Sequence, residues 1–154
     1  MESLQPIWEI AVGAAVLVAA MVVHGTGMYL VLLRAARHHG RGEAARHIPE
    51  RQIFFGMLIL MMMGTHIVEQ LLWAVVFTGI GAVPRLYDAF YLAAVTYTTL
   101  GYEDVKLPLQ WRLLAPLCTM TGMFAFGWTT GVMVSILGRH FAPPGTPGAP
   151  PARR

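Results

Sequence analysis

A polar stretch of seven residues, Thr98 to Asp104, interrupts an otherwise apolar part of the chain and carries the groups best suited to ion chemistry. Its sequence is TTLGYED, and it lies between a run with helical periodicity, 86–97, and a long apolar run, 113–137. Backbone outside a helix is tolerated at membrane depth only where protein surrounds it or where it lines a water-filled path. Rings of backbone carbonyl oxygens can replace the hydration shell of a cation. Presenting carbonyl oxygens to a cation is thus one use of a non-helical stretch at membrane depth.

Three ionisable side chains, His24, His66 and Glu69, lie inside other apolar runs and form a second candidate site. Ionisable groups at membrane depth are functional candidates. His66 and Glu69 are three residues apart and share one face of a helix. A polar contact that fixes helix packing is the simpler interpretation, with Glu69 bonded to Thr96 or Tyr97. A metal site with these three side chains as ligands is the alternative.

The composition predicts that these groups are positioned by membrane helices. Of 154 residues, 56% are hydrophobic and 12% are charged, which is typical of a small integral membrane protein. Three apolar runs, 7–33, 53–83 and 113–137, exceed the roughly 20 residues that a helix needs to cross a bilayer. The single cysteine, Cys118, excludes an intrachain disulfide.

Positive charge gathers in the predicted loop 34–52, where five arginines and three histidines face two glutamates between Arg34 and Arg51. The positive-inside rule places this loop in the cytoplasm, so the N-terminus lies outside and the C-terminus inside. The loop is suited to anionic lipid headgroups. Because the net charge of +3 comes from such membrane-flanking positions, we expect no nucleic-acid partner.

The segment between the second and third apolar runs has the features of a re-entrant loop. Apolar residues recur in 86–97 at helical spacing, and twelve residues span about 18 Å, which is half a bilayer. The negative end of such a helix dipole would favour a cation at the membrane centre. The Pro- and Gly-rich tail, 138–154, is predicted to be disordered. No nucleophile–base pair or phosphate loop occurs, so we expect neither an enzyme nor a bound cofactor.

The motif TTLGYED resembles the selectivity filter of potassium channels, which is usually TTVGYGD. Further matches are Arg112 at the start of the inner helix, the glycine hinge at Gly122, and the pair Phe126-Gly127. The resemblance implies an all-α membrane protein with three transmembrane helices and a re-entrant pore helix. The pore domain would span 53–137, as outer helix, pore helix, filter and inner helix. The helix 7–33 resembles the added N-terminal helix of small bacterial ion-channel proteins.

The same resemblance implies a homotetramer in the bacterial inner membrane that conducts potassium. Its filter would comprise Thr98, Thr99, Leu100, Gly101, Tyr102, Glu103 and Asp104. Potassium would be held by the backbone carbonyls of Thr99, Leu100, Gly101 and Tyr102, and Gly122 and Gly127 would act as gating hinges.

Departures from the family pattern leave alternatives open. Leu100 replaces a valine, Val95 replaces the usual pore-helix glutamate, and Glu103 replaces a glycine that ordinarily has φ > 0. The last change makes a non-selective cation channel the first alternative. A metal or proton transporter built on His24, His66 and Glu69 is the second.

Overall fold

The protein is built from helices, as the sequence predicts. The computed structural model describes residues 5–39, 48–102 and 104–141, and every regular element in these residues is helical. The long helices are α1 (Gln5–His39), α2 (Ile48–Gly79) and α4 (Leu114–Phe141), and the short ones are α3 (Leu86–Tyr97) and the 3₁₀ helix η3 (Leu109–Trp111). Two candidate membrane spans, Pro6–His38 and Gln52–Gly79, lie within α1 and α2, and a third, Leu109–Gly138, starts in η3 and continues through most of α4.

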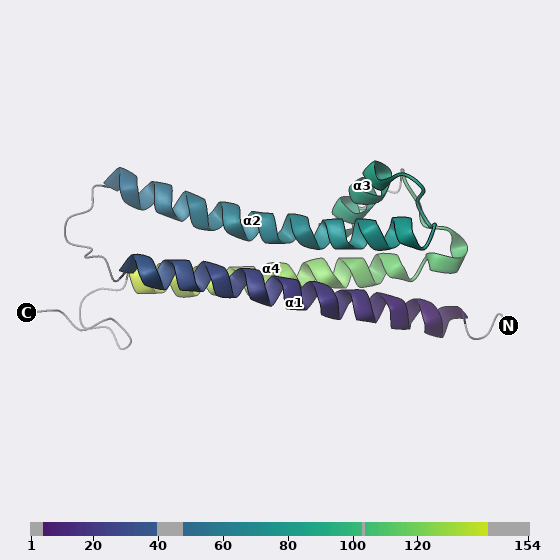
Figure 1. Ribbon diagram of the computed structural model, residues 1–154, viewed down its shortest axis with the longest axis horizontal. Coiled ribbons are helices and arrows are strands. Elements are labelled where there is room, and N and C mark those ends of the chain that lie inside the picture. The colour runs from purple at the N-terminus through teal and green to yellow at the C-terminus, as the bar shows by residue number, and fades with distance from the viewer. Residues whose placement is uncertain (1–4, 40–47, 103, 142–154) are drawn as a thin grey trace, which may run out of the picture.

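The three long helices lie side by side and alternate in direction (Figure 1). The short helix α3 lies against α2 at the end of the bundle where α1 begins (Figure 1). Helix α1 packs extensively on both α2 and α4, whereas α2 and α4 contact each other only slightly. The first helix is therefore an integral part of the bundle and joins the helices expected to be the outer and inner helices of the pore domain.

Helix α3 has the bounds that its periodicity predicts, and the long helices extend a few residues beyond the apolar runs. Residues 34–39 and 48–52, at the two ends of the predicted basic loop, are helical, as are 138–141 of the predicted tail. A helix satisfies its own backbone and can continue past the apolar run into flanks rich in Ala and Arg, which are good helix formers. Pro49 lies in the first turn of α2, where a missing N–H costs nothing. The remaining parts of the loop and tail, 40–47 and 142–154, lie outside the described residues.

Helix α2 ends at Gly79, four residues before the end of its apolar run at Val83. Gly81 adopts a left-handed conformation with φ of 73°, and the N–H groups of Ala82 and Val83 both donate to the carbonyl of Phe77. This arrangement closes the last turn of a helix with a glycine just beyond its end. The chain can then reverse towards α3.

The interior has two apolar clusters that are separated along the bundle by a polar layer. One cluster surrounds Trp73 and Phe77 beneath α3, and the other surrounds Met28 and Leu58 at the far end. Four polar residues between or beside them are buried: Glu9, His24, Glu69 and Thr121. Large apolar side chains cover the outside of all three long helices. Such a surface suits lipid or further copies of the chain.

Candidate functional site

The predicted filter starts directly at the C-terminus of α3 and is anchored to it by its amide groups. The N–H groups of Thr98 and Thr99 donate to carbonyls of Ala94 and Thr96, at 3.0 Å each. Those of Leu100 and Gly101 both donate to the carbonyl of Val95, at 2.9 and 3.2 Å. In the described part of the chain, by contrast, no hydrogen bond is accepted by the carbonyls of residues 99–102. Residues 98–102 are exposed in the single chain, so these oxygens are free for another partner.

The backbone of the predicted filter is strained at Thr99, a residue whose type does not indicate positive φ. Thr99 has φ of 63° and Gly101 has φ of 64°. A left-handed conformation costs a residue with a Cβ atom roughly 1–2 kcal/mol, and glycine almost nothing. Strain of this kind persists where surrounding contacts enforce it and often marks a functional site. Glu103, which replaces a glycine that ordinarily has positive φ, lies outside the described residues.

Asp104, behind the filter, is held by the pore helix. The Tyr91 hydroxyl donates to Asp104 Oδ2 at 2.8 Å, and the Val105 N–H donates to Asp104 Oδ1 at 3.2 Å. Tyr91 lies outside the three candidate spans. Its pKa is raised above 10.0, chiefly by this hydrogen bond, with smaller contributions from burial and from the charge of Asp104. The bond ties the last residue of the predicted filter segment to the first half of α3.

The raised pKa predicts a pH dependence of this tie. A group whose pKa is raised by folding contributes stability that is complete below its unfolded pKa, near 10.0, and is lost as the pH rises through the folded value. We expect Tyr91→Phe to lower the Tm of the purified protein below pH 10. The difference in Tm between wild type and variant should shrink at higher pH. A difference that grows with pH would contradict the assignment.

His24, His66 and Glu69 come together, as the sequence allowed, and two further side chains complete a closed ring of hydrogen bonds. Glu69 Oε1 lies 2.7 Å from His24 Nδ1, and Glu69 Oε2 accepts a hydrogen bond from the Tyr97 hydroxyl. Thr129 Oγ1 lies 3.3 Å from His24 Nε2 and 3.1 Å from His66 Nε2. His66 Nδ1 lies 2.8 Å from the Tyr97 hydroxyl, which closes the ring. Of the two partners predicted for Glu69, the structure therefore selects Tyr97.

The number of protons sets the charge of this ring. Its five contacts need five protons, whereas two neutral imidazoles, two hydroxyls and a carboxylate carry four. With a fifth proton, on Glu69 or on His24, every contact is satisfied and the ring has no net charge. An isolated charge at this depth would be very costly, so a neutral and complete ring is the arrangement that the interior favours.

The ring connects every helix of the bundle except the short η3. His24 comes from α1, His66 and Glu69 from α2, Tyr97 from α3 and Thr129 from α4. His24, Glu69 and Tyr97 are completely buried. The ring also lies between the two apolar clusters. It is therefore the polar layer that separates them.

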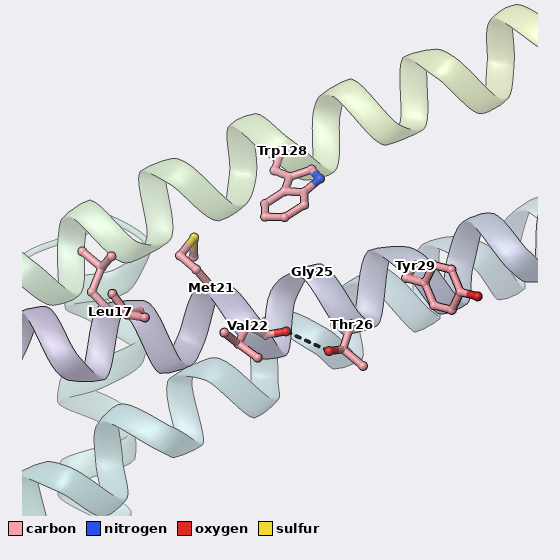
Figure 2. A pocket seen from close by; sticks show the side chains of 8 residues that line it. Leu17, Met21, Val22, Gly25, Thr26, Tyr29 and Trp128 are labelled. Carbon is pink, nitrogen blue, oxygen red and sulfur yellow. Dashed lines mark hydrogen bonds between the residues drawn. The ribbon is translucent and has the colours of Figure 1, made fainter.

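An apolar groove runs along the outside of α1 and α4 next to the ring (Figure 2). It has a volume of about 580 Å³, and its wall on α4 is Trp128, which extends towards Gly25 of α1 (Figure 2). The Trp128 ring also packs on His24, with ring centroids 5.4 Å apart. Trp128 thus separates the ring of hydrogen bonds from the groove.

Gly122, a predicted hinge, lies where α4 crosses the end of the pore helix. A Cβ atom at this position would overlap the carbonyl oxygen of Tyr97 and lie 2.9 Å from its carbonyl carbon. The absence of a side chain therefore allows α4 to contact the backbone of α3. Gly127, the other predicted hinge, has no atom within 4 Å of such a Cβ atom. The hinge function of both residues stays a prediction, and close packing is an additional role for Gly122.

Three contacts near the site involve residues that sequence reasoning did not assign. Thr129 gave no signal, because a threonine in an apolar run usually bonds to its own helix, as Thr130 does to Phe126. Glu9 of α1 is buried and accepts a hydrogen bond from the N–H of Leu113 at 3.0 Å, just before α4. The positive end of the α4 dipole stabilises a carboxylate at this position. Tyr91 could have been found only from its pairing with Asp104.

Comparison with known proteins identifies a family for the greater part of the chain. The ion channel family matches residues 53–139, which run from α2 through α3 and the filter into α4. No curated protein and no solved structure matches the chain. The family match and the three apolar helices make the chain an integral membrane protein. Because the match covers more than half of the 154 residues, the protein belongs to the ion channel family.

Proposed function

We propose that the protein is a homotetrameric potassium channel whose filter is the segment Thr98–Asp104. The observation that carries this proposal is the difference between the N–H groups and the carbonyl groups of this segment in their hydrogen bonding. The N–H groups of Thr98 to Gly101 are paired with carbonyls of α3, whereas the carbonyl oxygens of residues 99–102 accept no hydrogen bond within the described chain. A potassium ion requires several oxygens in place of its hydration shell, and backbone carbonyls can supply them.

Four copies are needed because one chain supplies only one row of oxygens. The exposed face of α4 gives the copies a surface on which to meet, with side chains that include Met120, Met123, Phe124, Val134 and Leu137. In an aqueous environment so many exposed apolar side chains would be unfavourable. The surface of α4 therefore supports an arrangement in which it faces other copies or lines the pore.

The proposed orientation has the N-terminus outside and the C-terminus in the cytoplasm of a bacterial cell. Arg34 and Arg37 lie exposed near the end of α1 that is remote from the filter. Positive residues favour the cytoplasmic side and attract anionic headgroups. This orientation puts α3 and the filter towards the outer side. Because Glu103 replaces the usual glycine of the filter motif, a non-selective cation channel is the closest alternative.

A metal or proton transporter is a second candidate function, favoured by one observation. Ligand atoms of His24, His66 and Glu69 all lie within 4.8 Å of one another. All three side chains, however, already have hydrogen-bond partners inside the protein, and a bound metal would have to displace some of them. The channel accounts better for the free carbonyls of the filter, which a transporter built on the histidines would not use.

Alanine at Gly101 tests the role of the filter. The left-handed φ of 64° should cost the alanine variant about 1–2 kcal/mol in each subunit and distort the row of carbonyls. We expect potassium flux into liposomes to fall at least about tenfold, since 1.4 kcal/mol corresponds to a factor of ten. Gly81→Ala is the matched control, because Gly81 has φ of 73° and equally open surroundings but lies at the end of α2.

The control variant should lose stability by a similar amount and keep its flux per folded channel. Wild-type flux in Gly101→Ala, combined with loss of flux in His66→Gln, would support the transporter instead.

A further inference from the structure

We infer that α1 is a positioning element for the ion filter, and that it acts through a relay from His24 to Glu69 to Tyr97. The inference deepens the proposed channel function and rests on it. The family matches residues 53–139, and α1 lies outside that range. The inference therefore assigns a role in the pore to a helix that the family match does not include.

The first step is the contact between α1 and α2 in the centre of the bundle. His24 and Glu69 are both completely buried, and the 2.7 Å between His24 Nδ1 and Glu69 Oε1 is a short hydrogen-bond distance. The other nitrogen of His24 contacts Thr129 of α4. His24 therefore orients one oxygen of the Glu69 carboxyl group and leaves the other for the next partner.

The second step is the contact between Glu69 and the pore helix. Tyr97 is the last residue of α3 and is completely buried. Its hydroxyl is bonded to Glu69 and His66, and its ring packs edge-on against Phe126 at a centroid distance of 5.5 Å. Its backbone carbonyl faces Gly122. The end of α3 is thus fixed by its side chain on one side and by its backbone on the other.

The third step leads from α3 to the filter. Four successive amides, from Thr98 to Gly101, donate to carbonyls of residues 94–96 in the last turn of α3. Close-packed protein interiors transmit displacements, so a shift of this last turn moves the filter backbone with it. The position of the carbonyl oxygens therefore depends on Tyr97, on Glu69 and finally on His24.

A leucine at His24 tests the relay in the full chain reconstituted in liposomes. Leucine keeps most of the side-chain volume and removes both polar contacts. We expect the ratio of potassium to sodium flux to fall about tenfold while the oligomer persists, because the filter loses its support. His24→Gln should restore most of the ratio, since an amide can donate to Glu69 and accept from Thr129.

Thr26→Val is the matched control on α1. The Thr26 hydroxyl is exposed on the groove side and donates to the carbonyl of Val22 in its own helix, so it takes no part in the relay (Figure 2). The control should keep the wild-type flux ratio. A general sensitivity of the channel to changes in α1 would instead lower the ratio in Thr26→Val as well, and that result would overturn the relay.

Tyr97→Phe provides an independent variant that removes a single oxygen atom at the other end of the relay. It should lower the flux ratio as His24→Leu does, and the double variant should be no worse than either single one, since residues of one network are not additive. A folded Tyr97→Phe channel with the wild-type ratio of potassium to sodium flux would overturn the inference. This test remains decisive even when His24→Leu does not assemble. A wild-type protein that passes both ions equally would instead refute the proposed potassium channel itself.

Discussion

Alanine at Gly122 is expected to prevent stable packing of α4 on the pore helix. Its Cβ atom would overlap the carbonyl oxygen of Tyr97, which is backbone and has little freedom to move. Insertion of a methyl group into a well-packed contact costs about 1–3 kcal/mol, and the cost recurs in each subunit of an oligomer. We expect a lower Tm and a reduced fraction of oligomer on size-exclusion chromatography in detergent.

The same variant separates the packing role of Gly122 from its predicted role as a hinge. A residue that serves only as a hinge would tolerate alanine in the resting state, so that the Tm stays unchanged and only channel opening suffers. Gly56→Ala in α2 is the control, because nothing lies within 4 Å of a Cβ atom there. It should leave the Tm unchanged or raise it slightly, since alanine favours a helix over glycine by up to about 1 kcal/mol.

Leucine at Glu69 is expected to have the largest effect on stability of any single change in the ring. It removes the partner of two groups, His24 Nδ1 and the Tyr97 hydroxyl, whose side chains are completely buried. His24 Nδ1 is then left without a partner, whereas the Tyr97 hydroxyl keeps its contact with His66. Leaving a buried polar group unpaired costs about 1–3 kcal/mol, so the variant should lose about 2–3 kcal/mol. Thermal unfolding in detergent should show this loss as a large decrease in Tm.

Two further variants define how the loss at Glu69 arises. Glu69→Gln keeps the volume and can pair with both partners, so it should lose less than half as much stability. The neighbour Gln70 is partly buried and makes no hydrogen bond in the described residues, so Gln70→Leu should have little effect. Equal losses of stability in Glu69→Leu and Gln70→Leu would show that any polar side chain at this depth of α2 affects the stability, and would contradict a specific role of the ring.

Much of the architecture could be predicted from the sequence because apolar length and short periodic runs have direct physical consequences. The bounds of α3, Leu86–Tyr97, follow from helical spacing between a proline and a polar segment. The approach of His24 to His66 and Glu69 could be anticipated, since polar groups in a membrane interior must find one another. The ends of the long helices could not, because a helix continues beyond the apolar run that predicts it.

The placement of α1 between α2 and α4 was not predictable for a physical reason. All three long helices are apolar on most sides, so no amphipathic face indicates which neighbour each one contacts. Packing of such helices depends on small residues and on single polar contacts. Gly27 against Thr65, Gly122 against Tyr97 and Thr129 between the two histidines decide the arrangement here. Each is recognisable only once its partner is known.

The most direct test of the central claim is a comparison of potassium and sodium flux through the wild-type protein in liposomes, with and without barium. The carbonyls of residues 99–102 accept no hydrogen bond in the described part of the chain, and we therefore predict potassium flux that exceeds sodium flux severalfold and that barium blocks. Equal flux of the two ions would contradict potassium selectivity and point to the effect of Glu103. Absence of any flux, in a preparation shown to contain the assembled oligomer, would contradict the channel itself.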